Sequence, residues 1–260
     1  MNSNQDFFKK RIADLAAQAD MQHIYTNTRF LTPEEQSIVL SLKQELPVPV
    51  RLIGRNDYPG SSESGDSSIR KIAVFGSAKD FGYEFDNPIR IIHIKPKAEK
   101  FAEQLSHRDY LGSLMGLGIE RELTGDIVIR GKEAWVFVID QIVPFLCDEL
   151  TQVRHTTVFS EEVMGEVPEL SPEFQSMNFN VASERIDLLL SCITGSTREA
   201  GKKLLREEKV FVNGMTVFSA GFKLHEGDVI VVRGFGKYIY DGVVSTSRKG
   251  RCNLTLRKYV

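Results

Sequence analysis

The stretch that decides the fold of the C-terminal part lies at residues 183–238 and reads SERIDLLLSCITGSTREAGKKLLREEKVFVNGMTVFSAGFKLHEGDVIVVRGFGKY. Apolar residues at helical spacing predict a first helix, which we expect Ser183 to cap and Gly195 to end. A short strand then enters the turn Asn213-Gly214, which is the strongest short hairpin signal a sequence offers. A second turn, Gly227-Asp228, precedes another strand, so the stretch is predicted to form two helices followed by paired strands.

The second predicted helix carries a row of positive charges. Ser196-Thr197-Arg198-Glu199 has the form of a capping box, in which Ser196 bonds the first turn and Glu199 reaches back. The cations recur at three- or four-residue spacing and therefore share one helical face: Arg198, Lys202, Arg206 and Lys209. Outward N–H groups at a helix start, with an arginine beside them, suit a phosphate. Taken alone, such a row is more often a solvated helix face than a binding site.

Net charge separates this region from the rest of the chain. Residues 181–260 hold 14 Lys and Arg against 8 Asp and Glu, a net charge of +6. Residues 1–180 hold 19 basic and 27 acidic side chains, a net charge of −8. An acidic body with a basic end indicates that the basic end meets a polyanion, because clustered cations release counterions from phosphates.

The C-terminal stretch resembles the S4 domain, an RNA-binding module named after a protein of the small ribosomal subunit. Arg185 and Asp187 lie on the first helix, Ser196-Thr197-Arg198 opens the second, and the two turns follow in the family's order. Glu208 is a departure, since the family more often has glycine there, and the second helix is expected to end differently. Charge and resemblance together predict these RNA-binding residues: Arg185, Ser196, Thr197, Arg198, Lys202, Lys203, Arg206, Lys209, Asn213, Lys223, Arg233 and Lys237.

Further side chains of this region extend the predicted surface. Arg248, Lys249 and Arg251 would widen it with more positive charge. Phe235 and Tyr238 would offer stacking faces for bases, unless one of them belongs to the core.

The order of elements in the body is also informative. A helix is predicted over residues 5–19, and a second helix begins where Thr32 caps and Pro33 takes the first helical position. From residue 89 to residue 159 the predicted order is β-α-β-β-α-β, which is that of a split βαβ, ferredoxin-like sandwich. Many RNA-binding domains share this order, and so do many proteins that bind no RNA.

These elements predict an α+β chain of three parts joined in series. The expected bounds are an N-terminal helix and strand segment at 1–85, a ferredoxin-like middle domain at 86–160, an acidic linker at 161–180 and an S4-like domain at 181–260. The Gly/Ser/Asp stretch at residues 54–68 is expected to be a mobile loop.

Residues 106–122, SHRDYLGSLMGLGIERE, place three glycines within seven residues. Each glycine would weaken a helix by roughly 1 kcal/mol relative to alanine, so close backbone approach or a helix break is expected here. This stretch and the domain order resemble the YlmH family of bacterial proteins with a C-terminal S4 domain. The resemblance implies binding of rRNA and tRNA on the large ribosomal subunit, a role in rescue of stalled translation and, in some members, in cell division. His107, Arg108 and Arg121 would be additional RNA or partner contacts.

Other classes of function leave no convincing trace. We expect no catalytic residue, no metal site, no cofactor and no membrane span, and the widely spaced cysteines and absent leader pattern favour the cytoplasm. His93 and Trp135 fit a sheet and a hairpin core better than a ligand site. Two alternatives stay open: an RNA-modifying enzyme of the pseudouridine synthase kind targeted by its S4 domain, and an adaptor that binds proteins, as in cell division.

Overall fold

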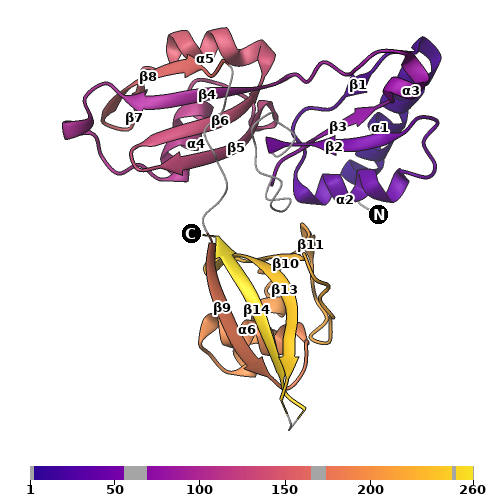
Figure 1. Cartoon of the computed structure of the whole chain (residues 1–260), viewed down its shortest axis with the longest axis vertical. Coiled ribbons are helices and arrows are strands. Elements are labelled where there is room, and N and C mark those ends of the chain that lie inside the picture. The colour runs from indigo at the N-terminus through magenta and orange to yellow at the C-terminus, as the bar shows by residue number, and fades with distance from the viewer. Residues whose placement is uncertain (1–2, 56–68, 165–173, 248–249, 260) are drawn as a thin grey trace. The chain divides into compact units, whose positions relative to one another are not determined.

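The computed structural model describes residues 3–55, 69–164, 174–247 and 250–259. The chain divides into two compact units, Met1–Ser171 and Pro172–Val260, and each is described here by itself. Both units mix helices with antiparallel sheet, so the predicted α+β class is confirmed (Figure 1). Arg248 and Lys249 lie outside the described residues, as does most of the predicted mobile loop.

The N-terminal part of the first unit packs two helices on a three-stranded antiparallel sheet of order β1-β3-β2. Its helix α2 begins with the predicted Thr32 cap, which the structure completes as a capping box: Thr32 accepts from the backbone of Glu35, and the Glu35 side chain accepts from the backbone of Thr32. The core of this part includes Ile12, Val39 and Phe75. The element bounds are α1 Ser3–Gln22, β1 Thr26–Asn27, α2 Pro33–Leu42, β2 Val50–Ile53, β3 Ile72–Phe75 and α3 Ala78–Phe81.

The middle part contains the predicted ferredoxin-like arrangement. Its five-stranded sheet has the order β5-β6-β4-β8-β7, and the first four of these strands reproduce the antiparallel order of a split βαβ sandwich with β7 added at one edge. The bounds are β4 Ile89–Pro96, η2 Glu99–Phe101, α4 His107–Gly116, η3 Arg121–Leu123, β5 Thr124–Arg130, β6 Glu133–Ile139, η4 Asp140–Ile142, α5 Val143–Glu149, β7 Gln152–Val153 and β8 Thr156–Glu162.

The N-terminal and middle parts share one hydrophobic core, so the predicted boundary near residue 85 does not separate two compact bodies. Phe30 and Val74 pack in the same buried cluster as Ile91 and Phe137 of the middle sheet. A Cβ on Gly125 would lie 2.6 Å from the Phe30 ring, so a larger residue would push the ring away. Glycine thus serves close approach at position 125, which the sequence analysis did not single out.

The glycines of residues 112–118 behave differently from the first expectation. Nothing lies within 4 Å of a Cβ built on Gly112 or Gly116, so close backbone approach is wrong for both. The expected helix break is correct: α4 ends at Gly116, and Gly118 takes a left-handed conformation with a φ of 81°.

The second unit is a six-stranded antiparallel sheet with two helices on one face (Figure 1). The strand order is β11-β10-β12-β13-β14-β9. Leu189 and Leu190 of α6 and Leu205 of α7 are buried in one cluster with Tyr238 and Leu256 of the sheet. The bounds are β9 Phe174–Val181, α6 Ile186–Thr194, α7 Arg198–Arg206, β10 Val210–Val212, β11 Met215–Thr216, β12 Val229–Val232, β13 Gly236–Thr246 and β14 Cys252–Tyr259.

Three predictions for this region need correction. The linker predicted at 161–180 is wrong at both ends, because β8 runs to Glu162 and β9 pairs along its whole length with β14. Ser183 does not cap the first helix: the N-cap is Arg185, and the N–H of Ile186 bonds the Phe222 carbonyl instead. The second helix is capped by Thr197, one residue later than predicted, whose hydroxyl accepts from the Ala200 N–H.

Candidate nucleic-acid interface

Helix α7 is held against α6 by a close backbone contact. A Cβ on Gly201 would lie 2.8 Å from the carbonyl oxygen of Asp187 and 3.1 Å from Cβ of Leu190. Only glycine allows the two helices to approach this closely without a shift. Gly201 and Leu205 therefore face the core, and the cationic side chains of α7 are left on the outer side.

The centre of the interface is a carboxylate that anchors two arginines. Asp187 is 0% exposed, although it lies only one side chain below the surface. Its carboxylate accepts from Nε of Arg198 at 2.7 Å and from Nε and Nη2 of Arg185 at 3.2 and 3.3 Å. Burial opposes ionisation of this group, but the hydrogen bonds and charges of Arg185 and Arg198 outweigh it and lower the pKa of Asp187.

The anchoring leaves both guanidinium groups accessible. The side chains of Arg185 and Arg198 are 43% and 47% exposed. Within the described residues, Arg198 contacts Asp187 through Nε, and no hydrogen bond occupies its two Nη groups, which leaves them for a bidentate acceptor. A guanidinium that is already positioned loses less conformational entropy when a phosphate binds.

The lysines of α7 are paired with nearby carboxylates. Lys202 lies 2.6 Å from Glu199, and Lys203 and Lys209 lie 3.7 and 2.8 Å from Glu207. Hydrogen bonds from these lysines lower the pKa of Glu199 and of Glu207. All are surface pairs, which contribute little to stability and exchange readily.

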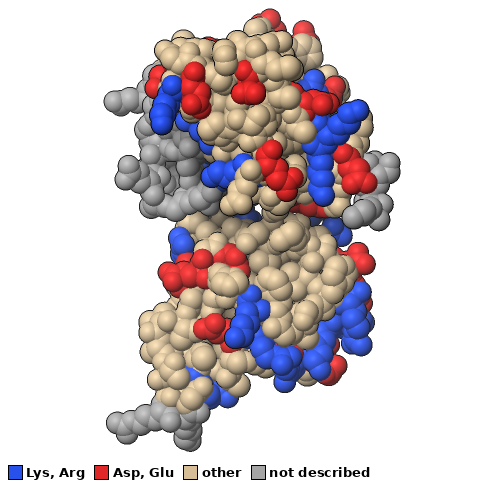
Figure 2. All heavy atoms as spheres, turned by 90° about the vertical axis from the view of Figure 1, so that its right-hand side faces the viewer, with Lys and Arg blue, Asp and Glu red and all other residues tan. Residues whose placement is uncertain are grey.

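Arg206 is exposed and has no hydrogen-bond or ion-pair partner within the described parts of the chain. Lys223 joins the same region, because it pairs with Arg185 in an isolated β-bridge. Figure 2 shows Lys and Arg side chains gathered in a band on the C-terminal unit. The α7 surface, as used below, comprises Arg185, Arg198, Lys202, Lys203, Arg206, Lys209 and Lys223.

Other predicted residues have structural roles or lie outside the α7 surface. The Asn213 side chain donates to Asp228 and accepts from the Val229 N–H, so it fixes the hairpin turn. Ser196 precedes the Thr197 cap and is exposed. Arg251 bonds the side chain and the carbonyl of Asn180 on β9.

Arg233 and Lys237 are not part of the α7 surface. Their neighbours Val232 and Tyr238 point into the core beneath the helices, so alternation places Arg233 and Lys237 on the other face of the sheet. Of the two expected stacking residues, Tyr238 is core, and Phe235 is partly exposed.

Of the extra contacts predicted in the first unit, Arg121 has a structural role and the other two are exposed. Arg121 donates to the carbonyls of Thr124 and Gly125, and burial together with the charge of Arg70 lowers its pKa to about 10. His107 and Arg108 lie at the exposed start of α4, and the surrounding protein and the charge of Arg121 lower the pKa of His107. The adjacent Asp109 accepts from the backbone and hydroxyl of Ser106, so it caps the helix.

The middle sheet holds an aromatic and cationic group that the sequence analysis did not select. Phe159 is 45% exposed, and Lys95 Nζ lies 5.7 Å from its ring centroid. Beside them, His93 stacks on Trp135 at 4.5 Å and bonds Glu133 at 2.7 Å, as expected for a satisfied sheet histidine and a hairpin core. Lys95 of β4 and Phe159 of β8 are opposite one another in the antiparallel pairing of these strands. The period of two in both strands was the sequence signal for this pair.

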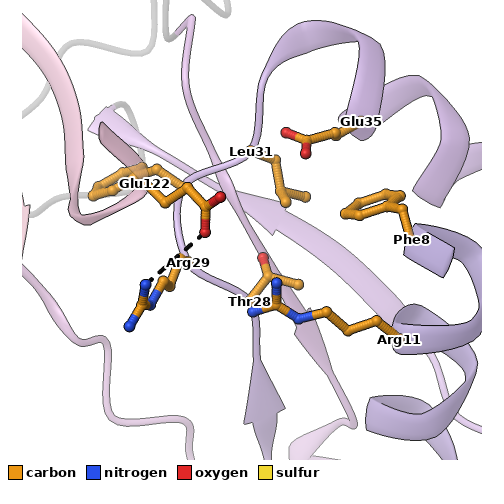
Figure 3. Close-up of a pocket in the computed structure, with 8 residues that line it drawn as sticks. Phe8, Arg11, Thr28, Arg29, Leu31, Glu35 and Glu122 are labelled. Atoms are coloured by element: carbon orange, nitrogen blue, oxygen red, sulfur yellow. Dashed lines mark ion pairs between the residues drawn. The ribbon is translucent and has the colours of Figure 1, made fainter. Parts of the chain in front are cut away.

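A small pocket of the first unit gathers both signs of charge (Figure 3). Arg11 and Arg29 point toward it from α1 and from the segment before α2, and Glu35 and Glu122 oppose them. Arg29 lies 4.0 Å from Glu122 and closer to Glu120, so the site is largely self-neutralised. Its lining residues are Phe8, Arg11, Thr28, Arg29, Phe30, Leu31, Glu35 and Glu122.

Metal-binding clusters and membrane-spanning helices would indicate other functions. In the described ranges, no group of three or more His, Cys, Asp or Glu side chains is placed to hold a metal ion. No described helix is long and apolar enough to cross a membrane.

Comparisons with known proteins find relatives of this chain. Residues 83–166 match the model of a family described as "Putative RNA-binding domain in YlmH", and this range spans the ferredoxin-like part. The chain is 25% identical over 232 residues to the ribosome-associated protein quality control protein P2 of Bacillus subtilis (strain 168), covering 89% of this chain and 86% of that protein. A solved structure titled cell division protein ylmH from Streptococcus pneumoniae covers 63% of this chain and is itself covered to 93%, with 16% identity and a TM-score of 0.49.

The family match lies in the middle part, and the similarity to the Bacillus relative extends over 89% of this chain. RNA binding and association with ribosomes are the properties these relatives are named for. Over residues 83–166 the chain matches the YlmH RNA-binding domain model, and along most of its length it is similar to the Bacillus protein.

Proposed function

We propose that this protein binds structured RNA of the ribosome through the α7 surface and acts in the rescue or quality control of stalled translation. The observation that carries the proposal is the buried Asp187, which fixes Arg185 and Arg198 at the N-terminal end of a cationic helix. The Bacillus relative is named for ribosome-associated quality control, which supports a ribosomal partner. The family's description supports RNA as the ligand.

The physical basis is phosphate binding at the surface of α7. Charge-assisted hydrogen bonds of guanidinium groups contribute about 1.5–3 kcal/mol each. The lysines add positive charge whose carboxylate partners are exposed, so a phosphate can replace them at small cost. Cations at several points of one face fit the backbone of folded RNA, which presents phosphates at regular intervals.

The role requires binding and no chemical step. Two carboxylates beside the predicted RNA contacts, Asp187 and Asp109, are occupied in anchoring arginines and capping a helix. We further propose that the RNA is rRNA and tRNA of the large ribosomal subunit. Crosslinking in cells, followed by sequencing of the recovered RNA, tests this: reads concentrated on large-subunit rRNA and tRNA are expected, and reads on scattered small RNAs would favour the modifying enzyme instead.

A binding experiment tests the surface itself. Lys202→Gln with Arg206→Gln removes two cations and spares Arg198, which neutralises Asp187. We expect affinity for a folded ribosomal RNA fragment to fall, and the slope of log K against log salt to decrease by about 0.7–0.9 per cation. Filter binding over a salt series measures both quantities.

The matched control is Lys9→Gln with Lys10→Gln, which removes the same charge from exposed positions of α1. It should leave the slope unchanged. An α7 variant that keeps the wild-type slope and circular dichroism spectrum would contradict the assignment.

A further inference from the structure

The sheet of the C-terminal unit has a second face, opposite the helices, that carries an ordered set of side chains. Strand alternation sends Tyr238 and Leu256 to the core and their neighbours Lys237 and Arg257 outward. The pairing register then aligns residues from successive strands: Phe211 with Val231, Val231 with Lys237, and Tyr259 with Phe174. The outer sheet face, as used below, comprises Phe174, Phe211, Arg233, Lys237, Arg257 and Tyr259.

Cations and aromatic rings alternate across this face. Lys237 Nζ lies 4.3 Å from the Tyr259 ring centroid, and the Arg257 guanidinium lies 4.9 Å from that of Phe174. The rings of Phe174 and Tyr259 meet edge to face at 4.9 Å. At the other end of the sheet, the Arg233 guanidinium lies 4.6 Å from the Phe211 ring. These contacts hold the rings and the charges at fixed mutual positions.

The face is also positively charged and polar. Arg257 is paired with Asp241 through Nε and Nη2, whereas Arg233 and Lys237 lie over rings. The set holds three cations, and Asp241 beside it pairs with Arg257. Beyond the rings, the hydroxyl of Thr255 donates to Asn178, and Asn180 donates to Asn253, so amide groups continue the face along β9 and β14.

These features define the occupant by its chemistry. The α7 surface consists of cations and their carboxylate partners, which fits phosphates but gives no stacking surface. The outer sheet face adds rings that can stack on unpaired bases, and amides that can bond base edges. A protein partner would need acidic side chains opposite the three cations and would gain little from exposed amides.

We propose that the outer sheet face binds unpaired nucleotides of RNA, as a site separate from the α7 surface. Bases would stack on Phe174 and Tyr259, while Lys237, Arg257 and Arg233 follow the phosphates. The two faces of one domain would then hold folded and single-stranded RNA at the same time.

The test uses the full-length chain and a short fluorescein-labelled oligouridine, which forms no duplex. Phe174→Leu with Lys237→Gln removes a ring and a charge and keeps an apolar side chain at the edge strand. Fluorescence anisotropy should show affinity reduced by about fivefold or more, the usual effect of losing one base stack. Arg233→Gln, at an exposed position, should weaken binding in the same direction and serves if the double variant does not fold.

The matched control is Lys202→Gln with Arg206→Gln, which should weaken folded RNA while leaving oligouridine affinity within about twofold, because additive effects are expected at separate sites. The proposal is overturned if the wild-type chain does not bind oligouridine, which would point to a protein on this face. It is also overturned if the sheet variants bind as wild type, or if only the α7 variant loses oligouridine. None of these outcomes depends on whether the α7 surface binds ribosomal RNA.

Discussion

The α7 surface and the outer sheet face lie on the same small domain, and both are rich in cations, but they hold their charges differently. On α7 the cations contact carboxylates, as Arg198 contacts Asp187 and Lys202 contacts Glu199. On the sheet they lie over rings, as Lys237 lies over Tyr259. A cation paired with a carboxylate can exchange it for a phosphate, whereas a cation over a ring can move to a phosphate and leave the ring face to a base.

The difference shows how one fold can separate recognition of backbone from recognition of bases. Phosphate contacts fix position and carry little sequence information, while contacts to bases discriminate. It also shows which interactions are structural: Asp187 is a buried charge on which two arginines depend, whereas Asp241 on the sheet is a surface partner of Arg257. The predictions that follow separate these roles.

The largest effect is expected from removal of the buried anchor. Asp187→Asn leaves Arg185 and Arg198 without their counter-charge, and it should lower the free energy of unfolding by about 2–3 kcal/mol. This is less than for a fully buried pair, because both arginines remain about half exposed and can hydrate. Urea denaturation measures the change, and Asp241→Asn is the control on the opposite face, with an expected loss below about 1 kcal/mol.

The same substitution has a defined dependence on pH. The folded-state pKa of Asp187 is lowered, so its stabilising contribution is present above the ordinary carboxyl pKa of about 3.9 and is lost as the pH falls toward the lower folded value. The gap in stability between wild type and Asp187→Asn should therefore narrow below that pH. A gap that is constant across this range would show that the carboxylate charge is not what holds the arginines.

A second prediction concerns the contact that presents α7. Gly201→Ala places a Cβ 2.8 Å from the Asp187 carbonyl, and the backbone must shift. Overpacking typically costs about 1–3 kcal/mol, and the higher helix propensity of alanine returns roughly 1 kcal/mol, so we expect a net loss of about 1–2 kcal/mol. RNA affinity of the α7 surface should fall with it, while oligouridine binding by the sheet is retained.

Gly112 of α4 provides the matched control for that experiment. A Cβ there meets nothing within 4 Å, so Gly112→Ala should stabilise the first unit by up to about 1 kcal/mol. Thermal unfolding of both variants measures the two changes in stability. A Gly201→Ala protein that is as stable as wild type would show that the two helices can separate freely, and the α7 surface would then be less rigid than described.

The two faces also differ in how far the sequence could predict them. Helical spacing and the resemblance to the S4 domain placed Lys202 and Arg206 on one exposed face, because that spacing is a local property. The same analysis listed Arg233 and Lys237 together with the α7 cations, whereas the structure places them on the outer sheet face. Side chains alternate between the two faces of a strand, so the buried Val232 and Tyr238 place their neighbours on the other face. The pattern was used only to predict strands and not to decide which face each side chain takes.

Other features depended on distant parts of the chain. Strand β9 was taken for a linker, since its outward positions are Ser176, Asn178 and Asn180, and polar residues of this kind usually mark loops. Only its pairing with β14 makes it a strand, and that pairing brings Phe174 to Tyr259. The buried state of Asp187 was likewise invisible, because it requires α7 to fold back on α6 at Gly201.

The smallest expected effect is at the end of α7, where the sequence departs from the S4 pattern. Glu208 has a φ of 54°, a left-handed conformation that favours glycine, and the N–H of Lys209 bonds the Leu204 carbonyl as in a glycine-terminated helix. The helix therefore ends as it would with glycine at position 208, contrary to the expectation from residue type, and the backbone of Glu208 is strained. Glu208→Gly should raise the free energy of unfolding by about 0.5–1 kcal/mol, measurable by urea denaturation.

Glu208→Gly also removes a carboxylate beside the α7 cations, so it should affect the α7 surface and not the outer sheet face. Affinity for folded RNA should rise slightly, whereas oligouridine affinity should not change, since the outer sheet face has no part in the helix end. Glu208→Gln is the control, because it removes the same charge and keeps the strained conformation. If the Glu208→Gly and Glu208→Gln proteins are equally stable, the left-handed conformation costs nothing and the gain in RNA affinity is purely electrostatic. If only Glu208→Gly is more stable than wild type, backbone strain at Glu208 lowers the stability of the chain at the end of its RNA-binding helix.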